Sequence, residues 1–399
     1  MNNVPASERI SIGFFGCTNS GKSSLVNAIT GQEVSLVSEV SGTTTDPVKK
    51  AMELLPLGPV VLIDTPGLDD KSQLGSLREK RTRDIMKQIH IAVIVADISR
   101  GITTVEKELE QWLKQEEIPY LYVFNKTDCG KNCLPDHAWE EKGVKVSAVT
   151  KENIELLKEK MAALIPQKNS KRLVADLLEE GDHVVLVIPI DQSAPKGRLI
   201  LPQQQVIRDI LDAGCTLSVC PVKKVGHTLE LLQKKPKLVI TDSQVFGEVK
   251  GMVPDDIMLT SFSILFARYK GDLESAVRGA LKLDCLKDGD KVLISEGCTH
   301  HRQCGDIGTQ KLPKWILEYT GKQLDFTFTS GGDFPEELSG YQLVIHCGAC
   351  MLNEKQMDDR RKRAKRNEIC MTNYGIVIAY MNGILKRSVE AFGELHNLF

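Results

Sequence analysis

The chain has 399 residues, 42% of them hydrophobic, and this length predicts two or three globular domains. Its 51 basic and 53 acidic residues leave a net charge of -2, which excludes a global attraction to nucleic acid or to anionic membranes. The N-terminus has no charged segment followed by an apolar one, and no stretch approaches the roughly 18 apolar residues that cross a bilayer. We therefore expect a cytoplasmic protein with no membrane partner, in which binding of nucleic acid would need a local basic patch.

The first chemical motif follows the predicted strand ISIGFFG. Residues 16–23 read GCTNSGKS, which fits G-x-x-x-x-G-K-S between a strand and the helical stretch SLVNAITG. In such a loop the backbone N–H groups surround the phosphates of a nucleotide. Lys22 is expected to neutralise the β- and γ-phosphates, and the Ser23 hydroxyl to bind Mg²⁺. The residues expected to bind the phosphates are Gly16, Asn19, Ser20, Gly21, Lys22, Ser23 and Ser24.

Three further motifs follow predicted strands downstream. In VVLIDTPGL, the Asp64 carboxylate is placed to reach the magnesium shell, and the Gly67 amide to sense a γ-phosphate. LYVFNKTD ends in Asn125, Lys126, Thr127 and Asp128, and KVSAVT contributes Ser147 and Ala148. The Asp128 carboxylate can accept from the N1–H and the N2 amino group of guanine, a donor pair that adenine lacks. The four signals therefore predict a GTP-binding domain over residues 1–168.

This domain resembles the Era and TrmE branch of small GTPases. In that branch a G-T-T motif supplies the second protein ligand to Mg²⁺, which implies Thr44 within SGTTTDP. The P-loop asparagine of the branch binds K⁺ beside the phosphates; Asn19 matches that position, although it could instead only support a loop turn. Leu68 stands where Ras-like enzymes carry a water-positioning glutamine. We therefore expect a slow, potassium-stimulated GTPase with Asn19, Lys22, Thr44, Asp64 and Gly67 as its catalytic residues.

Residues 172–262 predict a small parallel α/β domain. After the polar linker QKNSKR, the strands DHVVLVIPID, CTLSVC and KLVITD alternate with the helices PQQQVIRDILDAG and HTLELLQKK. The segment contains no phosphate loop, catalytic dyad or metal-ligand spacing, and its His183 and His227 are isolated. We interpret it as a dimerisation domain.

Residues 263–399 resume the alternation of helices and strands and add two metal-binding patterns. KVLISE is followed by Gly297, Cys298, Thr299 and His300, and YQLVI by the run HCGAC at 346–350. The carboxyl ends of parallel strands share one sheet edge, so we expect the two loops to converge. The full pattern is C-x-H-x45-H-C-x-x-C. Three thiolates and a histidine suit tetrahedral zinc, whereas three thiolates on a 4Fe-4S cluster leave one iron with a replaceable ligand. Spacing alone leaves zinc and iron open.

Behind an Era-like GTPase, this pattern resembles the FeFe-hydrogenase maturation GTPases, the HydF family, over the whole chain. The resemblance implies an α/β chain of three domains, with a P-loop GTPase fold followed by two smaller parallel α/β domains. They are a GTP-binding domain (1–168), a dimerisation domain (172–262) that makes a homodimer, and a 4Fe-4S cluster-binding domain (263–399). The implied ligands are Cys298, Cys347 and Cys350, with His300 or His346 at or near the fourth iron.

The family's function is also implied by this resemblance. Its members are GTP-hydrolysing scaffolds that deliver a transient diiron subcluster precursor to apo-hydrogenase. Two radical S-adenosylmethionine maturases build the ligands of that precursor. The alternative function is a TrmE- or Era-like RNA-related GTPase with a structural zinc site in its C-terminal domain.

Two features of the C-terminal domain have more than one interpretation. His301 and Cys304 are possible extra metal ligands, but they fit equally as structural residues outside the family pattern. A basic run on a predicted helix could bind nucleic acid or dock an acidic partner, although such a run is usually a solvated face. Its members are Arg360, Arg361, Lys362, Arg363, Lys365 and Arg366.

Overall fold

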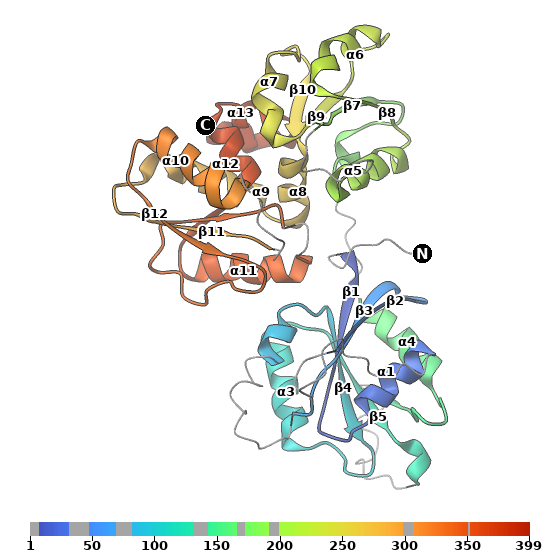
Figure 1. The fold of residues 1–399 in the computed structure, drawn as a ribbon. Helices are drawn as coiled ribbons and strands as arrows, with labels where there is room; N and C mark the ends of the chain where they lie inside the picture. Colours follow the sequence, from blue (N-terminus) through green and yellow to red (C-terminus); the bar gives the residue numbers. More distant parts are fainter. Residues whose placement is uncertain are drawn as a thin grey trace. The chain divides into compact units, whose positions relative to one another are not determined.

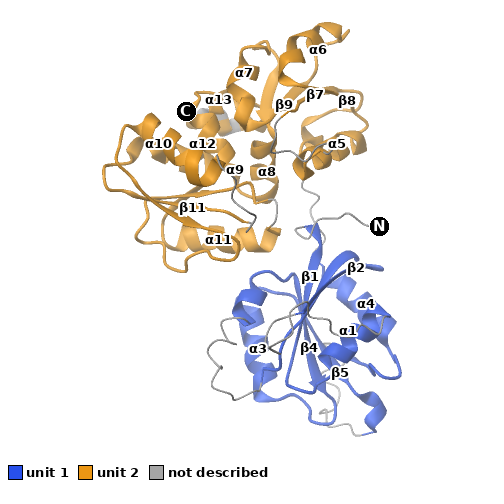
Figure 2. Cartoon of the chain, in the orientation of Figure 1, with its two compact units in different colours: residues 1–169 blue, residues 170–399 orange. Residues whose placement is uncertain are grey.

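The computed structural model describes residues 8–31, 48–68, 82–130, 143–165, 172–190, 199–297, 306–349 and 352–399 (Figure 1). The chain divides into two compact units, Met1–Asn169 and Ser170–Phe399 (Figure 2). The first unit holds one mixed sheet, and the second holds two parallel sheets. This arrangement confirms the predicted α/β fold class with three domains, of which the second and third share one compact unit.

The first unit is built on a six-stranded sheet in the order β2-β3-β1-β4-β5-β6, in which only the β2–β3 pair is antiparallel. Its central strands are apolar almost throughout, as expected for strands that helices cover on both faces. Its strands are β1 (Ile10–Phe15), β2 (Val48–Leu54), β3 (Gly58–Asp64), β4 (Ile91–Asp97), β5 (Tyr120–Asn125) and β6 (Gly143–Lys145). Its helices include α1 (Lys22–Thr30), α3 (Thr104–Gln115) and α4 (Ile154–Ala163).

The second unit begins with a four-stranded parallel sheet in the order β10-β9-β7-β8. Its strands are β7 (His183–Val187), β8 (Thr216–Cys220), β9 (Leu238–Thr241) and β10 (Met258–Ser261). The associated helices are α5 (Leu201–Asp212), α6 (Val225–Leu231), α7 (Phe246–Lys250) and α8 (Phe262–Lys270). His183 is hydrogen-bonded within this sheet, because its ring nitrogens lie 2.8 and 3.0 Å from the hydroxyls of Thr216 and Ser218.

The second sheet of this unit is also parallel, in the order β12-β11-β13-β14. Its strands are β11 (Lys291–Ser295), β12 (Asp325–Thr329), β13 (Leu343–His346) and β14 (Cys370–Asn373). The helices are α9 (Leu273–Leu281), α10 (Leu312–Thr320) after a π-helical turn, α11 (Glu354–Arg366), α12 (Tyr374–Met381) and α13 (Leu385–Val389). No helix among the described residues combines the length and apolar character needed to cross a membrane.

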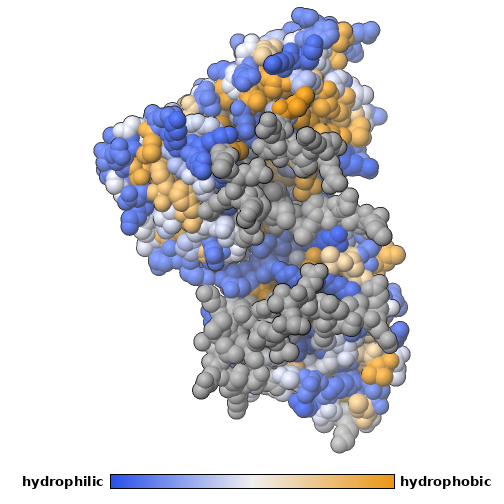
Figure 3. All heavy atoms as spheres, in the orientation of Figure 1, coloured by the Kyte–Doolittle hydropathy of each residue, from blue (hydrophilic) through white to orange (hydrophobic). Residues whose placement is uncertain are grey.

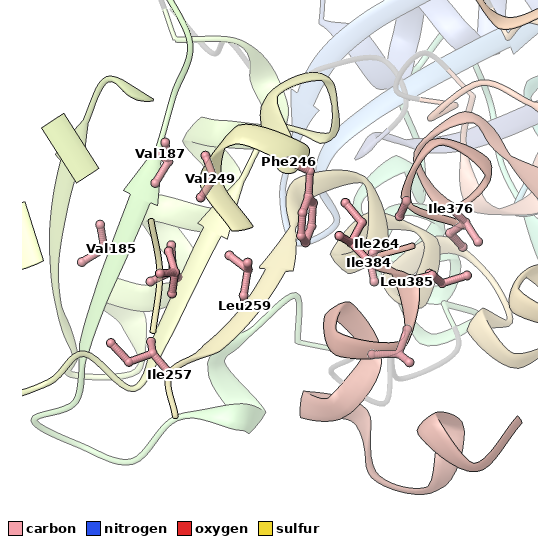
Figure 4. Packing of buried hydrophobic residues seen from close by; sticks show 14 of the residues in the cluster. Val185, Val187, Phe246, Val249, Ile257, Leu259, Ile264, Ile376, Ile384 and Leu385 are labelled. Atoms are coloured by element: carbon pink, nitrogen blue, oxygen red, sulfur yellow. The ribbon is translucent and has the colours of Figure 1, made fainter. Parts of the chain in front are cut away.

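Helix α12 joins the two parallel sheets into one unit. Ile376 and Ala379 belong to the hydrophobic cluster of the first of these sheets, whereas Val377 and Ile378 belong to that of the second. Figure 4 shows side chains of the β10-β9-β7-β8 sheet, among them Val185, in one cluster with Ile376 of α12 and residues of α13. A helix that is apolar on all sides is expected where it is buried between two layers. The sheet that carries HCGAC is therefore packed against the preceding domain through its own C-terminal helices.

Candidate nucleotide site and candidate metal centre

The P-loop lies where β1 meets α1, and two glycines allow its close approaches. Gly16 has φ +147°, and a Cβ there would lie 2.1 Å from the Val95 carbonyl oxygen. Gly21 has φ +90°, and its Cβ would lie 2.2 Å from Nδ2 of Asn125. Lys22 is buried, and its Nζ donates to the carbonyl oxygens of Gly16 (3.0 Å) and Cys17 (2.8 Å). The backbone is therefore folded as a phosphate-binding loop with its lysine beside it.

Ser23 and Asp64, both expected at the magnesium site, are in direct contact. The Ser23 hydroxyl donates to Oδ2 of Asp64 at 2.5 Å. Burial raises the pKa of Asp64, although the Ser23 hydrogen bond and the Lys22 charge oppose this. Oδ1 of Asp64 is buried and has no hydrogen-bond partner among the described residues. An unpaired carboxylate oxygen beside a serine hydroxyl fits a Mg²⁺ site, because hard cations prefer such oxygen ligands.

The DTPG loop lies directly against the P-loop. A Cβ on Gly67 would come within 2.1 Å of Thr18 Oγ1, and the Leu68 amide donates to the Gly16 carbonyl at 3.3 Å. Asn19, exposed at the loop tip, has φ +61°, a left-handed conformation that asparagine tolerates better than most residues. This backbone conformation agrees with the interpretation that Asn19 supports the turn of the loop. Its role as a K⁺ ligand stays a prediction, and Thr44 lies outside the described residues.

The residues expected to recognise the base come from loops at the same sheet edge and are joined by hydrogen bonds. Asn125 donates from Nδ2 to the Ser20 carbonyl at 3.1 Å and accepts from the Ala148 amide at 3.1 Å. The Ser147 hydroxyl donates to Oδ1 of Asp128 at 2.6 Å, and this hydrogen bond lowers the pKa of Asp128. Asp128 is therefore held as the carboxylate that guanine recognition requires.

Two acidic residues that no nucleotide-binding motif indicated, Asp97 and Glu106, also support this site. Asp97, at the end of β4, accepts from Nζ of Lys126 at 2.7 Å. Glu106, in the first turn of α3, is 1% exposed, and its Oε1 accepts from the P-loop amide of Cys17 at 3.4 Å. Its other oxygen accepts from the Thr103 amide at 3.0 Å, which completes a capping box. The T-x-x-E spacing at 103–106 was a readable signal for that box.

The candidate metal centre occupies the carboxyl edge of the second parallel sheet. Ser295, His346 and Asn373 lie in register on β11, β13 and β14, and Cys347 follows β13. Sγ of Cys347 accepts from the amides of Gly297 (3.0 Å) and Ala349 (3.4 Å). Ala349 has φ +52°, which turns the chain so that its amide faces the sulfur. Gly297, which follows β11, therefore contacts the loop after β13, whereas Cys298 lies outside the described residues.

The buried arginines of α11 correct one expectation. Arg360 and Arg363 are 5% and 8% exposed, so the interpretation of the basic run as a solvated face is wrong for both. Nη1 of Arg360 lies 2.6 Å from Nε2 of His346, and Nη1 of Arg363 donates to the Phe334 carbonyl at 3.2 Å. The signal was present in the sequence, because Arg360 lies one helical turn from Ala364 on the face that packs against the sheet.

A cleft of about 710 Å³ opens beside Cys347. It is lined by residues of α8, α9, α11 and β14, among them Phe266, Lys270 and Met357. Lys270 donates from Nζ to the carbonyl oxygens of Ala349 (2.9 Å) and Leu352 (3.4 Å), so it ties α8 to both sides of the cysteine loop. Helix α8, which packs on the first parallel sheet, therefore contacts the cysteine loop of the second parallel sheet directly.

The described part of the donor set fits a thiolate-bound metal. Two backbone N–H groups on one sulfur stabilise a thiolate and are among the hydrogen bonds that tune iron–sulfur clusters. No group of three metal-ligating side chains occurs among the described residues. Cys298, His300, His301, Cys304 and Cys350 lie outside them, so their roles stay predictions.

Three parts of the chain match known families. Residues 11–126 match the 50S ribosome-binding GTPase family, residues 173–271 the hydrogen maturase F dimerization domain, and residues 274–391 the hydrogen maturase F tetramerization domain. The last two matches cover most of the second unit. A dimerization domain and a tetramerization domain support self-association of the chain.

Curated relatives match part of the chain. GTPase Der of Helicobacter hepaticus is 35% identical over 124 residues, which are 30% of this chain and 25% of Der. The tRNA modification GTPase MnmE of Coxiella burnetii is 31% identical over 156 residues, 38% of this chain and 34% of MnmE. The chain thus spans about a quarter to a third of these relatives. The first domain is a GTPase domain related to Der and MnmE.

Solved structures of Era show a lower likeness. Era of Aquifex aeolicus bound to GDP and AlF4⁻ is 15% identical, with a TM-score of 0.34 over 81% of this chain and 94% of Era. Era in complex with MgGDPNP and 16S ribosomal RNA is 18% identical, with a TM-score of 0.33 over 53% of this chain and 93% of Era.

Proposed function

This chain belongs to the hydrogen maturase F family, and from that premise we propose that it is a GTP-hydrolysing scaffold and carrier in FeFe-hydrogenase maturation. It binds a 4Fe-4S cluster and delivers a diiron subcluster precursor to apo-hydrogenase. The observation that carries the proposal is the Cys347 sulfur, which accepts two backbone amides at the carboxyl edge of a parallel sheet. This placement supports a thiolate site in the domain where the family implies a cluster.

Cys298, Cys347 and Cys350 would hold the cluster. A corner that no cysteine fills supplies a replaceable ligand position, which suits a carrier that must bind and release its cargo. His300 is proposed to lie near that corner. Both ring nitrogens of His346 are engaged, Nδ1 with the Cys347 carbonyl oxygen and Nε2 with Arg360.

In this proposal GTP hydrolysis changes conformation or partner affinity and forms no bond in the cofactor. Contacts to a γ-phosphate order the switch segments of a GTPase, and hydrolysis releases them. Mg²⁺ is held by Ser23 and Thr44 with Asp64 nearby, and turnover is slow and stimulated by K⁺ at Asn19. The proposed macromolecular partners are apo-hydrogenase and two radical S-adenosylmethionine maturases, and the proposed location is the cytoplasm.

The proposed oligomer is a homodimer formed through the first parallel domain. Leu211 on α5, Val219 on β8 and Leu231 on α6 are 55%, 48% and 70% exposed. Figure 3 shows apolar residues gathered on one face of this domain in the region of β7 and β8. Contiguous exposed apolar surface favours association with another protein surface. It supports self-association on this side of the second unit.

Metal analysis of anaerobically purified protein tests the cluster proposal. We expect brown protein that contains iron and acid-labile sulfide, and loss of both when Cys298, Cys347 and Cys350 are replaced by alanine. Cys285→Ala is the matched control, because this exposed cysteine lies outside the motif. Colourless protein with one bound zinc would contradict the proposal and favour the TrmE- or Era-like alternative.

A further inference from the structure

Arg360 has a built environment behind the HCGAC loop. Nη1 of its guanidinium donates to Oγ of Ser295 at 3.2 Å and lies 2.6 Å from Nε2 of His346. Nη2 donates to the Gly331 carbonyl, and the guanidinium carbon lies 4.9 Å from the centre of the Phe334 ring. The guanidinium group of Arg360 thus contacts four residues, which fix its position. Solvent-exposed side chains of the same helix have no such restraint.

These contacts select one form of the His346 ring. Because a guanidinium can only donate, Nε2 of His346 must accept, and it therefore carries no proton. Nδ1 lies 2.8 Å from the Cys347 carbonyl oxygen, which can only accept, so Nδ1 carries the proton. The Nε2 lone pair, which a metal would need, is thus directed at Arg360. His346 itself is 1% exposed.

Arg360 also places a buried charge beside the cysteine loop. Burial lowers the pKa of Arg360 to about 10, while the Cys347 thiolate opposes this effect. The guanidinium is therefore still charged at neutral pH. A buried cation near a cluster stabilises its reduced, more negative form, because the local dielectric constant is low.

We propose that Arg360 is a positioning residue of the metal centre: it holds the Nε2 lone pair of His346, so that His346 supports the Cys347 loop and is not an iron ligand. The inference rests on the proposed function for the identity of the metal. The hydrogen-bonded pair itself needs no metal. A fourth protein ligand, if the cluster has one, must then come from a residue other than His346.

The hydrogen-bonded pair is tested first in metal-free protein. Nitrogen NMR of the full chain labelled with [¹⁵N]histidine, with His346→Gln to assign the signal, reports which ring nitrogen carries the proton. We expect His346 to be protonated at Nδ1 and unprotonated at Nε2. A His346 protonated at Nε2 would overturn the inference whether or not the chain binds a cluster.

The consequence for the cluster is tested by pulsed EPR of the reduced, iron-loaded protein with the same label. We expect the parent spectrum to contain no strong coupling that comes from a directly bound nitrogen of His346. The spectrum of His346→Gln should therefore show the same couplings as the parent. Such a coupling in the unmodified chain, lost in His346→Gln, would overturn the inference. Absence of iron in the chain would instead refute the proposed function, and the NMR result would still decide the pairing.

The charge effect is measured as the reduction potential of the cluster. Arg360→Met should lower the potential, and Arg360→Lys should restore part of the shift, since it keeps the charge but loses the fork. Arg366→Met, an exposed arginine of the same helix, is the matched control and should leave the potential unchanged. A potential unaltered in Arg360→Met, or altered equally in Arg366→Met, would contradict the assigned role.

Discussion

At the scale of single residues, Lys126 of the NKTD motif is held by a carboxylate that no motif names. Asp97 is 9% exposed and accepts from Lys126 Nζ (2.7 Å) and from the Ser99 hydroxyl (2.6 Å). Burial alone would raise the pKa of Asp97, but these hydrogen bonds outweigh it and lower the pKa. The charged form of Asp97 therefore stabilises the folded first unit.

Asp97→Asn should destabilise the first unit by about 1–3 kcal/mol at pH 7, because Lys126 loses a charge-assisted partner. A lowered folded-state pKa means that the stabilisation is present above the ordinary value of 3.8 and is lost as the pH falls through the lowered pKa. Urea unfolding at pH 7 and in steps below pH 4 checks this. A difference between variant and parent that does not shrink in acid would contradict the assignment.

Glu106 links helix α3 to the P-loop. Glu106→Gln keeps an acceptor for the Thr103 cap but removes the charge that faces the Cys17 amide. We expect nucleotide affinity to fall roughly 5- to 30-fold, corresponding to about 1–2 kcal/mol. Fluorescent-nucleotide titration measures this, with Glu116→Gln at the exposed end of the same helical segment as control. Equal affinities in all three proteins would show that the contact does not position the loop.

Asn19 has two interpretations that one substitution separates. Turnover of GTP should be faster in K⁺ than in Na⁺, and Asn19→Gly should remove that difference, because glycine keeps the φ of +61° without the side-chain amide. If Asn19 only supports the turn, Asn19→Gly will retain the full response. Equal turnover of the parent in the two salts would refute potassium stimulation.

The motif residues could be placed from the sequence, because their neighbours along the chain define their position. Ser23 lies at the start of α1 after β1, Asp64 ends β3, and Asp128 comes shortly after β5, so their place at one sheet edge follows from parallel pairing. Arg360 could not be placed in this way, because its burial depends on how α11 packs on the sheet. A charged side chain in a basic run is expected to be exposed to solvent. Arg360 is buried instead, because it forms contacts with His346 and Ser295 that the sequence does not reveal.

At the scale of elements, close helix–strand contacts hold the sheet that carries the metal loop. Gly279 of α9 packs on β14, where a Cβ would lie 2.6 Å from the Met371 carbonyl oxygen and 3.1 Å from Cβ of Thr372. The alternation of helices and strands over residues 263–399 is consistent with both elements. It did not predict that α12 faces two cores, because an all-apolar helix has no periodic signal that assigns its faces.

Gly279→Ala should destabilise the second unit by about 1–3 kcal/mol, because the added methyl group overlaps backbone atoms of β14. Gly226→Ala is the matched control: it is also a helical glycine, and a Cβ there meets no atom within 4 Å. Alanine at that exposed helix position should be neutral or stabilising. Chemical unfolding of the two variants measures the contrast, and equal destabilisation would show that the α9–β14 contact adapts without cost.

At the scale of the whole molecule, nucleotide chemistry and the cysteine loop belong to different compact units, Met1–Asn169 and Ser170–Phe399. The three-domain α/β architecture could be predicted, because each domain repeats the strand–helix alternation. The shared core of the second unit could not, since pairing of distant helices leaves no local sequence pattern. We expect replacement of the three motif cysteines to leave the rate of GTP hydrolysis unchanged.

The central claim is that the cysteine centre lets this chain carry a diiron precursor to a hydrogenase. The most direct measurement is hydrogen evolution by apo-hydrogenase after mixing with the full chain that has been loaded with a synthetic diiron precursor. We expect activation by the loaded parent and none by the variant lacking Cys298, Cys347 and Cys350, treated identically and freed of unbound precursor. Equal activation by the parent and the variant would contradict it.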